Sequence, residues 1–348
     1  MSNTMSAKTE KFVEIIKLSQ NENPFGVSPL ALKAIEEFYS SVYRYPDVHY
    51  EELKQKLSKK HNTPPNSIIM SAGSVALMDM SIKTFVEFDE NIITSEKTFV
   101  AYGLLAKINR RECRCAKLVN NTISLDNIMS LRDDKTKLIF IANPNNPTGT
   151  IITHDSFKKF LETMPSQVIV VIDEAYSEYV NDPLYPNSLE LQKTFKNLII
   201  FHTFSKIYGL AGLRIGYAIA HPDSAKRLEQ CRTPFSVNSL ASAAASAALD
   251  DTEYIRECVS INERERAFLY NELVNIGFNV TPSQGNFILV EFDTADEKDK
   301  IFTLLEGEGI LVRKLEPFGI ELGLRISVGR PKDNQHLVKI LKLIKKIL

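Results

Sequence analysis

The sequence predicts an α/β fold: a large three-layer αβα domain with a mostly parallel sheet, joined to a smaller α+β domain. Between about residues 65 and 220, short apolar runs rich in β-branched residues alternate with stretches whose apolar residues recur three and four positions apart. Strands that are apolar along their whole length indicate a sheet covered by helices on both faces. The chain has 348 residues, which suits two domains better than one core.

The predicted strands of the large domain are short apolar runs that carry few charges. Between them, the two clearest helices span residues 75–88 and 155–164. The strands are predicted at residues 67–73, 90–96, 136–144, 167–175, 197–206 and 214–220.

The pattern changes after about residue 250. An alanine-rich run at 239–251 predicts a tightly packed helix, and the charged segment after it predicts one long helix that ends near Gly277. Two strand-like segments then flank a helix at residues 298–309. We expect an N-terminal segment associated with the small domain, a large cofactor-binding domain and a small C-terminal α+β domain, at residues 1–40, 41–250 and 251–348.

The composition favours a soluble cytoplasmic protein and argues against several classes. A formal net charge of −1 gives no electrostatic footprint for nucleic acid or an anionic membrane. No apolar run approaches the roughly 20 residues that span a bilayer, and residues 1–19 lack the apolar core of an export signal. The four cysteines suit reduced thiols, and neither they nor the six histidines show the spacing of metal ligands, so we expect no metal.

Polar residues follow several predicted strands, at the edge where open α/β sheets bind ligands. The first strand leads into Gly73 and Ser74 and then a helix, whose N-terminus suits either a phosphate or a simple cap. The strand ending at Ala142 leads into a rigid loop, residues 143–149, with two prolines and several amides. That loop suits a turn alone or the orientation of a ligand.

Two further strands end on a carboxylate and on a lysine. Asp173 follows five apolar residues and is expected to be partly buried, so it needs a partner: a structural Arg or Lys, or a protonated ring nitrogen of a cofactor. The next strand leads to Ser205 and Lys206, and Arg214 follows eight positions later. Pyridoxal phosphate requires this combination: a lysine, a carboxylate for its pyridine nitrogen, and hydroxyls, a helix N-terminus and an arginine for its phosphate.

Nine stretches from residue 17 onward resemble the fold-type I pyridoxal-phosphate aminotransferases, and within them the histidinol-phosphate aminotransferase group. They occur in the family's order and cover almost all of the chain after that point. The stretches are KLSQNENPFG, YRYPD, NPNNPTG, VIDEAYSEY, TFSKIYGLAGLRIGYAIA, PFSVNSLA, QGNFILV, GILVRKL and LRISVG.

The resemblance implies a role for each matching residue at the cofactor. Lys206 would bind the cofactor covalently and move the proton between the two carbons of the transamination, and Asp173 would pair with the pyridine nitrogen. Phe99 would stack on the ring, and Tyr176 and Asn146 would bond to the oxygen of the ring hydroxyl. The implied phosphate contacts are Gly73, Ser74, Thr203, Ser205, Arg214 and, from a second subunit, Tyr45.

The resemblance also implies the reaction and the assembly. Arg325 would bind the carboxylate of the amino donor, while Arg313 and Asn23 would line the substrate side. A homodimer is implied because Tyr45 would cross between subunits. The implied reaction is a ping-pong exchange between glutamate or 2-oxoglutarate and a phosphorylated amino alcohol or ketone, with histidinol phosphate and imidazole-acetol phosphate first.

Some residues depart from the pattern of that group. Its members usually carry an N-terminal Pro-Tyr pair that packs over the substrate, and residues 1–16 contain no tyrosine. His202 stands where Arg is frequent, Arg330 stands where Thr is usual, and Ser74 is not followed by the common acidic residue. We therefore expect a matching cofactor site and a different substrate lid, so that another phosphorylated ketone or amino acid stays open.

Three other interpretations differ in how well the residues support them. A pyridoxal-phosphate decarboxylase of phosphorylated amino acids would use the same Lys206 and Asp173, so the sequence does not separate it from a transaminase. A non-catalytic binding protein on this fold is disfavoured because both residues are retained. A nucleotide-binding oxidoreductase fails because the glycines of GLAGLRIG lack the G-x-G-x-x-G spacing and precede a strand.

Overall fold

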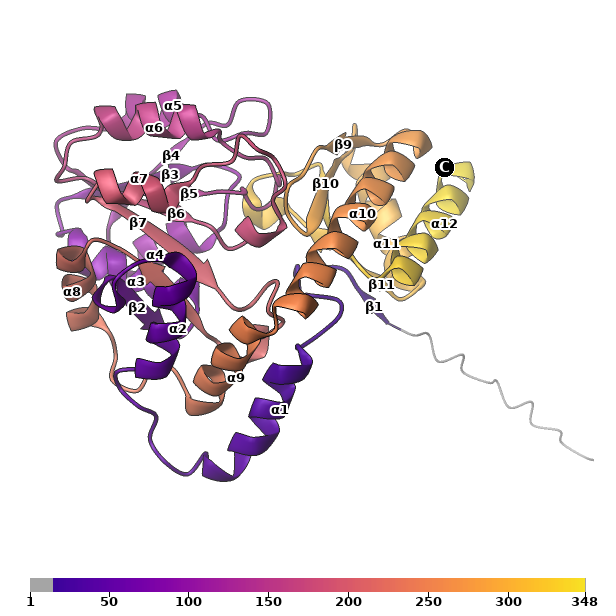
Figure 1. Ribbon diagram of the computed structural model, residues 1–348. Coiled ribbons are helices and arrows are strands. Elements are labelled where there is room, and N and C mark those ends of the chain that lie inside the picture. The colour runs from indigo at the N-terminus through magenta and orange to yellow at the C-terminus, as the bar shows by residue number, and fades with distance from the viewer. Residues whose placement is uncertain (1–14, 348) are drawn as a thin grey trace, which may run out of the picture.

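The structure is a computed structural model that describes residues 15–347. It contains a seven-stranded sheet, a four-stranded sheet and a two-stranded pair (Figure 1). The predicted N-terminal segment is described only from residue 15. The different substrate lid that we expect before that residue therefore lies outside the described part of the chain.

The seven-stranded sheet has the order β2-β8-β7-β6-β5-β3-β4. Strands β7, β6, β5, β3 and β4 run parallel, whereas β8 is antiparallel to both of its neighbours. The predicted mostly parallel sheet is therefore confirmed. Its strands are β2 (Ile68–Ser71), β3 (Asn91–Ser95), β4 (Glu112–Ala116), β5 (Thr136–Ala142), β6 (Ile169–Asp173), β7 (Leu198–Thr203) and β8 (Gly216–Ile219).

Strand β4 is the one member of this sheet that the sequence patterns did not predict. It lies at the sheet edge, where one side of the strand faces solvent. Its central Arg114 forms ion pairs with Glu112 and Asp133, both at 2.7 Å, instead of entering the core. An edge strand of this kind carries charges at alternate positions, so it lacks the apolar run used to recognise the others.

Helices cover both faces of the sheet, which confirms the three-layer arrangement. On β5, Leu138 and Phe140 face one apolar core and Ile139 and Ile141 face the other. Helices α3 (Ser74–Phe85), α4 (Ala101–Ile108) and α8 (Pro222–Cys231) contribute to the first core. The second core includes residues of α2 (Glu51–His61), α5 (Leu125–Leu131), α6 (His154–Thr163), α7 (Ser188–Thr194) and α9 (Ser239–Asp250).

The C-terminal part has its own antiparallel sheet, ordered β12-β13-β10-β9, and its own core. The long predicted helix is α10 (Thr252–Ile276), and it ends where Gly277 takes a φ of 95°. The other elements are β9 (Asn279–Thr281), β10 (Phe287–Glu291), α11 (Ala295–Gly307), β12 (Arg313–Lys314), β13 (Gly323–Ser327) and α12 (Pro331–Ile347).

The N-terminal segment contacts both parts of the molecule. Strand β1 (Ile16–Lys17) pairs in parallel with β11 (Ile310–Leu311), whereas α1 (Pro29–Phe38) lies against α9 (Figure 1). The domain boundaries at residues 40 and 250 stay predictions. No helix between residues 15 and 347 combines the length and the apolar character that a bilayer crossing requires.

Candidate active site

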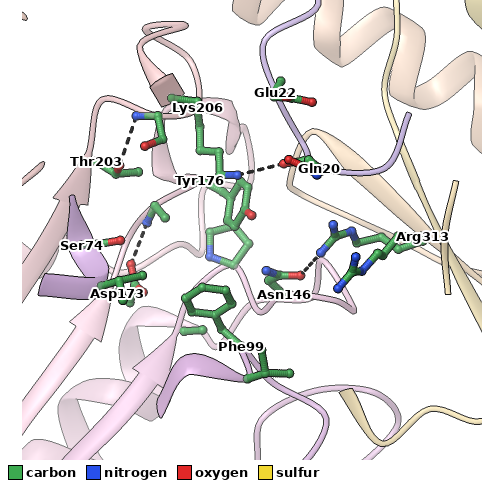
Figure 2. Close-up of a pocket in the computed structure, with 18 of the residues that line it drawn as sticks. Gln20, Glu22, Ser74, Phe99, Asn146, Asp173, Tyr176, Thr203, Lys206 and Arg313 are labelled. Atoms are coloured by element: carbon green, nitrogen blue, oxygen red, sulfur yellow. Dashed lines mark hydrogen bonds between the residues drawn. The ribbon is translucent and has the colours of Figure 1, made fainter. Parts of the chain in front are cut away.

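A pocket of about 430 Å³ opens at the carboxyl ends of β5, β6 and β7. The N-terminal segment and strands β12 and β13 complete its other wall, so residues far apart in sequence converge there (Figure 2). The predicted site residues that line it are Ser74, Phe99, Asn146, Asp173, Tyr176, Thr203, Ser205, Lys206, Arg214, Arg313 and Arg325.

Three predicted residues do not line this pocket. Gly73 lies directly behind it, as the residue before helix α3. Asn23 is buried, and its amide donates to the carbonyl of Ile207 at 2.8 Å, so it supports the lysine loop from outside the pocket. Tyr45 is 83% exposed and packs on Phe235 at a ring-centroid distance of 4.8 Å, away from the pocket of its own chain.

Helix α3 and Arg214 form a cradle for an anion. Gly73 precedes the helix with a φ of 85° and no side chain caps the first turn, so the N–H groups there keep their capacity to bind a ligand. A Cβ atom on Gly73 would lie 2.4 Å from a guanidinium nitrogen of Arg214. The arginine can therefore lie against the helix end only because residue 73 is glycine.

Two hydroxyl residues complete this cradle. Arg214 donates to Ser205 Oγ at 3.2 Å and to the carbonyl of Ala211 at 2.8 Å, which fixes its guanidinium. The Ser205 N–H donates to Thr203 Oγ1 at 3.1 Å. A cation, two hydroxyls and a helix N-terminus thus meet at one end of the pocket, a set that suits a phosphate group.

Asp173 ends β6 at the buried wall of the pocket. Its Oδ2 accepts a hydrogen bond from Tyr102 at 2.8 Å, and its Oδ1 accepts one from the Ala175 N–H at 3.2 Å. Burial raises the pKa of Asp173 to about 6, against the opposite effect of these bonds and of Lys206. None of the Lys and Arg residues in the described part of the chain forms an ion pair with it, so a cationic ring nitrogen remains the partner that the sequence predicted.

Lys206 reaches the pocket from the loop after β7. Its Nζ donates to the carbonyl of Gln20 at 3.1 Å and lies 5.4 Å from the centre of the Tyr176 ring (Figure 2). The amine therefore stands between the N-terminal segment and the strand ends, on the open side of the pocket.

The substrate wall contains two arginines in different states. Arg325 is buried, and it donates to Asn146 Oδ1 at 2.5 Å and to the carbonyl of Ser19 at 2.8 Å, while its Nε has no hydrogen-bond partner. Burial lowers the pKa of Arg325 to about 10. Among residues 15–347, no acceptor or carboxylate pairs with the guanidinium of Arg313, which faces the pocket (Figure 2).

The sequence patterns missed Tyr102, Gln20, Glu22 and Phe318, which also line the pocket. Tyr102 lies three positions after Phe99, a spacing that places two side chains on one face of a helix, but no helix was predicted over these residues. Gln20, Glu22 and Phe318 reach the pocket from the opposite wall, and no local sequence pattern predicts that position.

Two residues that depart from the family pattern lie outside the pocket. His202 is buried on the sheet face opposite to that of Tyr102, where it stacks on Tyr217, and its Nε2 lies 3.8 Å from Glu174 Oε2. Arg330 donates to the carbonyl of Pro24 at 2.8 Å. Within residues 15–347, no group of three or more His, Cys, Asp or Glu residues could hold a metal ion.

This arrangement suits a flat, phosphorylated aromatic ligand with a basic ring nitrogen. The phosphate would lie at α3 and Arg214, the nitrogen at Asp173, and the ring against Phe99, with an amine in reach at Lys206. The two arginines leave room for an anionic second molecule on the outer side.

Comparisons with known proteins relate the chain to aminotransferases. A family model described as aminotransferase class I and II matches residues 13–341. The chain is 39% identical over 329 residues to histidinol-phosphate aminotransferase of Caldicellulosiruptor saccharolyticus, which covers 94% of this chain and 91% of the relative.

Solved structures show the same fold. The chain is similar to histidinol-phosphate aminotransferase from Sinorhizobium meliloti in complex with pyridoxal-5'-phosphate, with a TM-score of 0.89, 26% identity, and 96% and 92% of the two chains covered. It is also similar to L-threonine-O-3-phosphate decarboxylase from Porphyromonas gingivalis, with a TM-score of 0.82, 25% identity, and 95% and 100% covered.

Proposed function

The chain belongs to the class I and II aminotransferase family, and from that premise we propose that it exchanges an amino group between glutamate and a phosphorylated ketone. The favoured pair is histidinol phosphate and imidazole-acetol phosphate, with 2-oxoglutarate as the partner of glutamate. The observation that carries the proposal is that Lys206, Asp173, Arg313 and Arg325 line one pocket.

The chain is a pyridoxal-phosphate-dependent aminotransferase. When bound, the cofactor supplies an aldehyde carbon that joins the amino group and a ring that accepts the electron pair released at the neighbouring carbon. The residues around it hold it, orient it and move protons.

Lys206 holds the cofactor and moves the proton. Its amine would hold the cofactor covalently until an amino substrate displaces it. The displaced amine would then serve as the general base toward the proton on the substrate carbon and as the acid that gives the proton back. The Gln20 carbonyl, 3.1 Å from Nζ, gives the released amine a defined resting position.

The other cofactor residues fix the ring. Asp173 keeps the ring nitrogen protonated, because an ionised carboxylate buried in this wall is stabilised by a cationic partner. Phe99 would pack on the ring face, and Tyr176 and Asn146 would bond to the ring oxygen. The N-terminus of α3 with Gly73 and Ser74, together with Thr203, Ser205 and Arg214, would bind the phosphate.

The two arginines divide the recognition of substrates. Arg325, held by Asn146 and Ser19, presents a fixed planar fork to the carboxylate of glutamate. Arg313, which has no partner within residues 15–347, takes the phosphate of the other substrate at the mouth of the pocket. One pocket can therefore accept in turn a dicarboxylic acid and a phosphorylated amine that lacks a carboxylate.

The enzyme acts as a homodimer in the cytoplasm in this proposal. Tyr45 lies with Tyr39, Val42, Tyr43 and Phe235 among the exposed large apolar side chains, and burial against a second copy would bring Tyr45 to the partner's phosphate site. The four free cysteines suit a reducing compartment. The oligomeric state in solution tests the homodimer. Weaker cofactor retention in a Tyr45→Ser variant tests whether Tyr45 reaches the phosphate site of the second copy.

Decarboxylation of a phosphorylated amino acid is the second candidate, favoured by the similarity to the Porphyromonas gingivalis decarboxylase. Both reactions use the same lysine and aspartate and differ in which bond at the substrate carbon is aligned for cleavage.

A panel of amino donors tests the proposal. The cofactor-loaded enzyme is mixed with histidinol phosphate, glutamate, phosphothreonine and small phosphorylated amines, and the visible absorption of the bound cofactor is followed for each. We expect the band to disappear with glutamate and histidinol phosphate. If histidinol phosphate leaves the band unchanged while glutamate removes it, the phosphorylated substrate is another one; carbon dioxide release from phosphothreonine would favour decarboxylation.

A further inference from the structure

The start of helix α4 supplies two aromatic side chains to the pocket. Phe99 lies two residues before the helix, Tyr102 lies in its first turn, and the Tyr102 N–H donates to the Phe99 carbonyl at 3.3 Å. Their rings meet edge to face, with centroids 5.8 Å apart and planes at 88°. The orientation of the Phe99 ring is therefore set by the ring of Tyr102.

Tyr102 also controls the orientation of Asp173. Its hydroxyl donates to Oδ2 at 2.8 Å, and the Ala175 N–H donates to Oδ1 at 3.2 Å. Each carboxylate oxygen thus has one donor from the protein, and these two bonds prevent the carboxylate from rotating about its own axis. The remaining lone pairs are left for a partner in the pocket.

Tyr102 itself has little freedom. It is completely buried, and its ring stacks on Phe140 with centroids 4.9 Å apart and planes at 10°. Burial, followed by the nearby Asp173 charge, raises the pKa of Tyr102 well above its usual value. The phenol therefore keeps its proton and remains a hydrogen-bond donor throughout the working range of an enzyme.

We propose that Tyr102 is a positioning residue for the cofactor ring, with two separate actions. Its ring holds Phe99 in the plane against which the cofactor packs, and its hydroxyl aims the Asp173 carboxylate at the ring nitrogen. One side chain thus sets the edge and the face of the cofactor site together. The inference depends on the cofactor and not on the choice of substrate.

Removing the hydroxyl separates these two actions. In Tyr102→Phe the ring stays, so Phe99 keeps its orientation, but Asp173 retains the Ala175 N–H alone. A buried carboxylate with one donor fewer favours its neutral form and can rotate. We expect cofactor affinity to fall about tenfold, and the ring nitrogen of the bound cofactor to become less protonated. Tyr102→Leu removes the ring as well and should weaken binding further.

The test measures the cofactor in the absence of any amino substrate. The dissociation constant of pyridoxal phosphate and the ¹⁵N signal of its labelled ring nitrogen are recorded for the parent and the variants. Tyr217→Phe is the matched control, because this buried hydroxyl bonds to His61 Nε2 at 2.7 Å in the core on the other sheet face. Thermal unfolding of the cofactor-free proteins shows whether each variant folds.

The expected result is a shift of the nitrogen signal toward the unprotonated value in Tyr102→Phe but not in Tyr217→Phe. If both variants lose the same stability and neither moves the affinity or the signal, Tyr102 is a packing residue and the inference is wrong. Because the measurement contains no amino substrate, its result does not depend on whether histidinol phosphate is the correct substrate.

Discussion

The two walls of the pocket are built in different ways. The cofactor wall uses strand ends along one edge of a single sheet: Asp173 ends β6, Thr203 ends its neighbour β7, and Gly73 follows β2, which β8 separates from β7. The substrate wall is assembled from distant segments, as when Arg325 on β13 donates to the carbonyl of Ser19 in the N-terminal segment at 2.8 Å. A parallel sheet fixes the first wall, whereas the second depends on how two parts of the chain meet.

This difference explains why the cofactor wall identifies its ligand more readily than the substrate wall does. Groups at neighbouring strand ends are held in register by the sheet, so their chemistry identifies the cofactor without reference to the rest of the molecule. The substrate wall includes a guanidinium with no partner within residues 15–347 and borders a segment that the structure describes only from residue 15. Mutations in the two walls should therefore have separable effects on cofactor and substrate.

The largest effect is expected at Lys206. Lys206→Ala should lower the rate of amino transfer at least about 1,000-fold, because the variant loses both the attachment point and the general base. Borohydride reduction of the loaded parent, followed by peptide mass analysis, should place the cofactor on Lys206. Lys83→Ala, on the exposed side of α3, is the control. A Lys206→Ala enzyme with a tenth of the parental rate would contradict the assignment.

Arg325→Lys should break the substrate wall and spare the cofactor wall. An ammonium cannot reproduce the planar fork held by Asn146 and Ser19, so kcat/KM for glutamate should fall about 100-fold. Cofactor content, measured by absorption after gel filtration, should stay at the parental value. Loss of cofactor together with activity would show that the two walls are not separable.

Gly73→Ala should weaken the cofactor wall and leave the substrate wall unchanged. The new Cβ would displace the Arg214 guanidinium, and the backbone at Gly73 lies in a region that costs other residues about 1–3 kcal/mol. We expect cofactor affinity to fall about 30-fold, the equivalent of about 2 kcal/mol. Gly307→Ala is the matched control, since open space surrounds that position in helix α11. Equal affinities in the two variants would remove Gly73 from the phosphate site.

Arg313→Gln should give the smallest effect and the most selective one. The side chain has no partner within the described residues that would be left unpaired, so only its contact with the substrate phosphate is lost. We expect kcat/KM to fall about fivefold, or about 1 kcal/mol, for the phosphorylated amine and to change little for glutamate. Steady-state kinetics with each donor measure this, and an equal loss for both would place Arg313 at a shared position.

The sequence predicted the sheet and the cofactor wall better than the substrate wall. Apolar runs marked the central strands, and the residues that follow them marked Asp173 and Lys206. The strand β4 was missed because its alternate charges belong to an edge, and Asn23 turned out to bond to the lysine loop instead of lining the pocket. Gln20 and Phe318 reach the pocket only through tertiary structure, which no local spacing encodes.

The most direct test of the account is the stoichiometry of one complete reaction. The loaded enzyme is supplied with histidinol phosphate and 2-oxoglutarate, and the glutamate formed and the histidinol phosphate consumed are measured together. We expect one glutamate for each histidinol phosphate consumed. Consumption without glutamate, or no consumption while other amino donors react, would contradict the account.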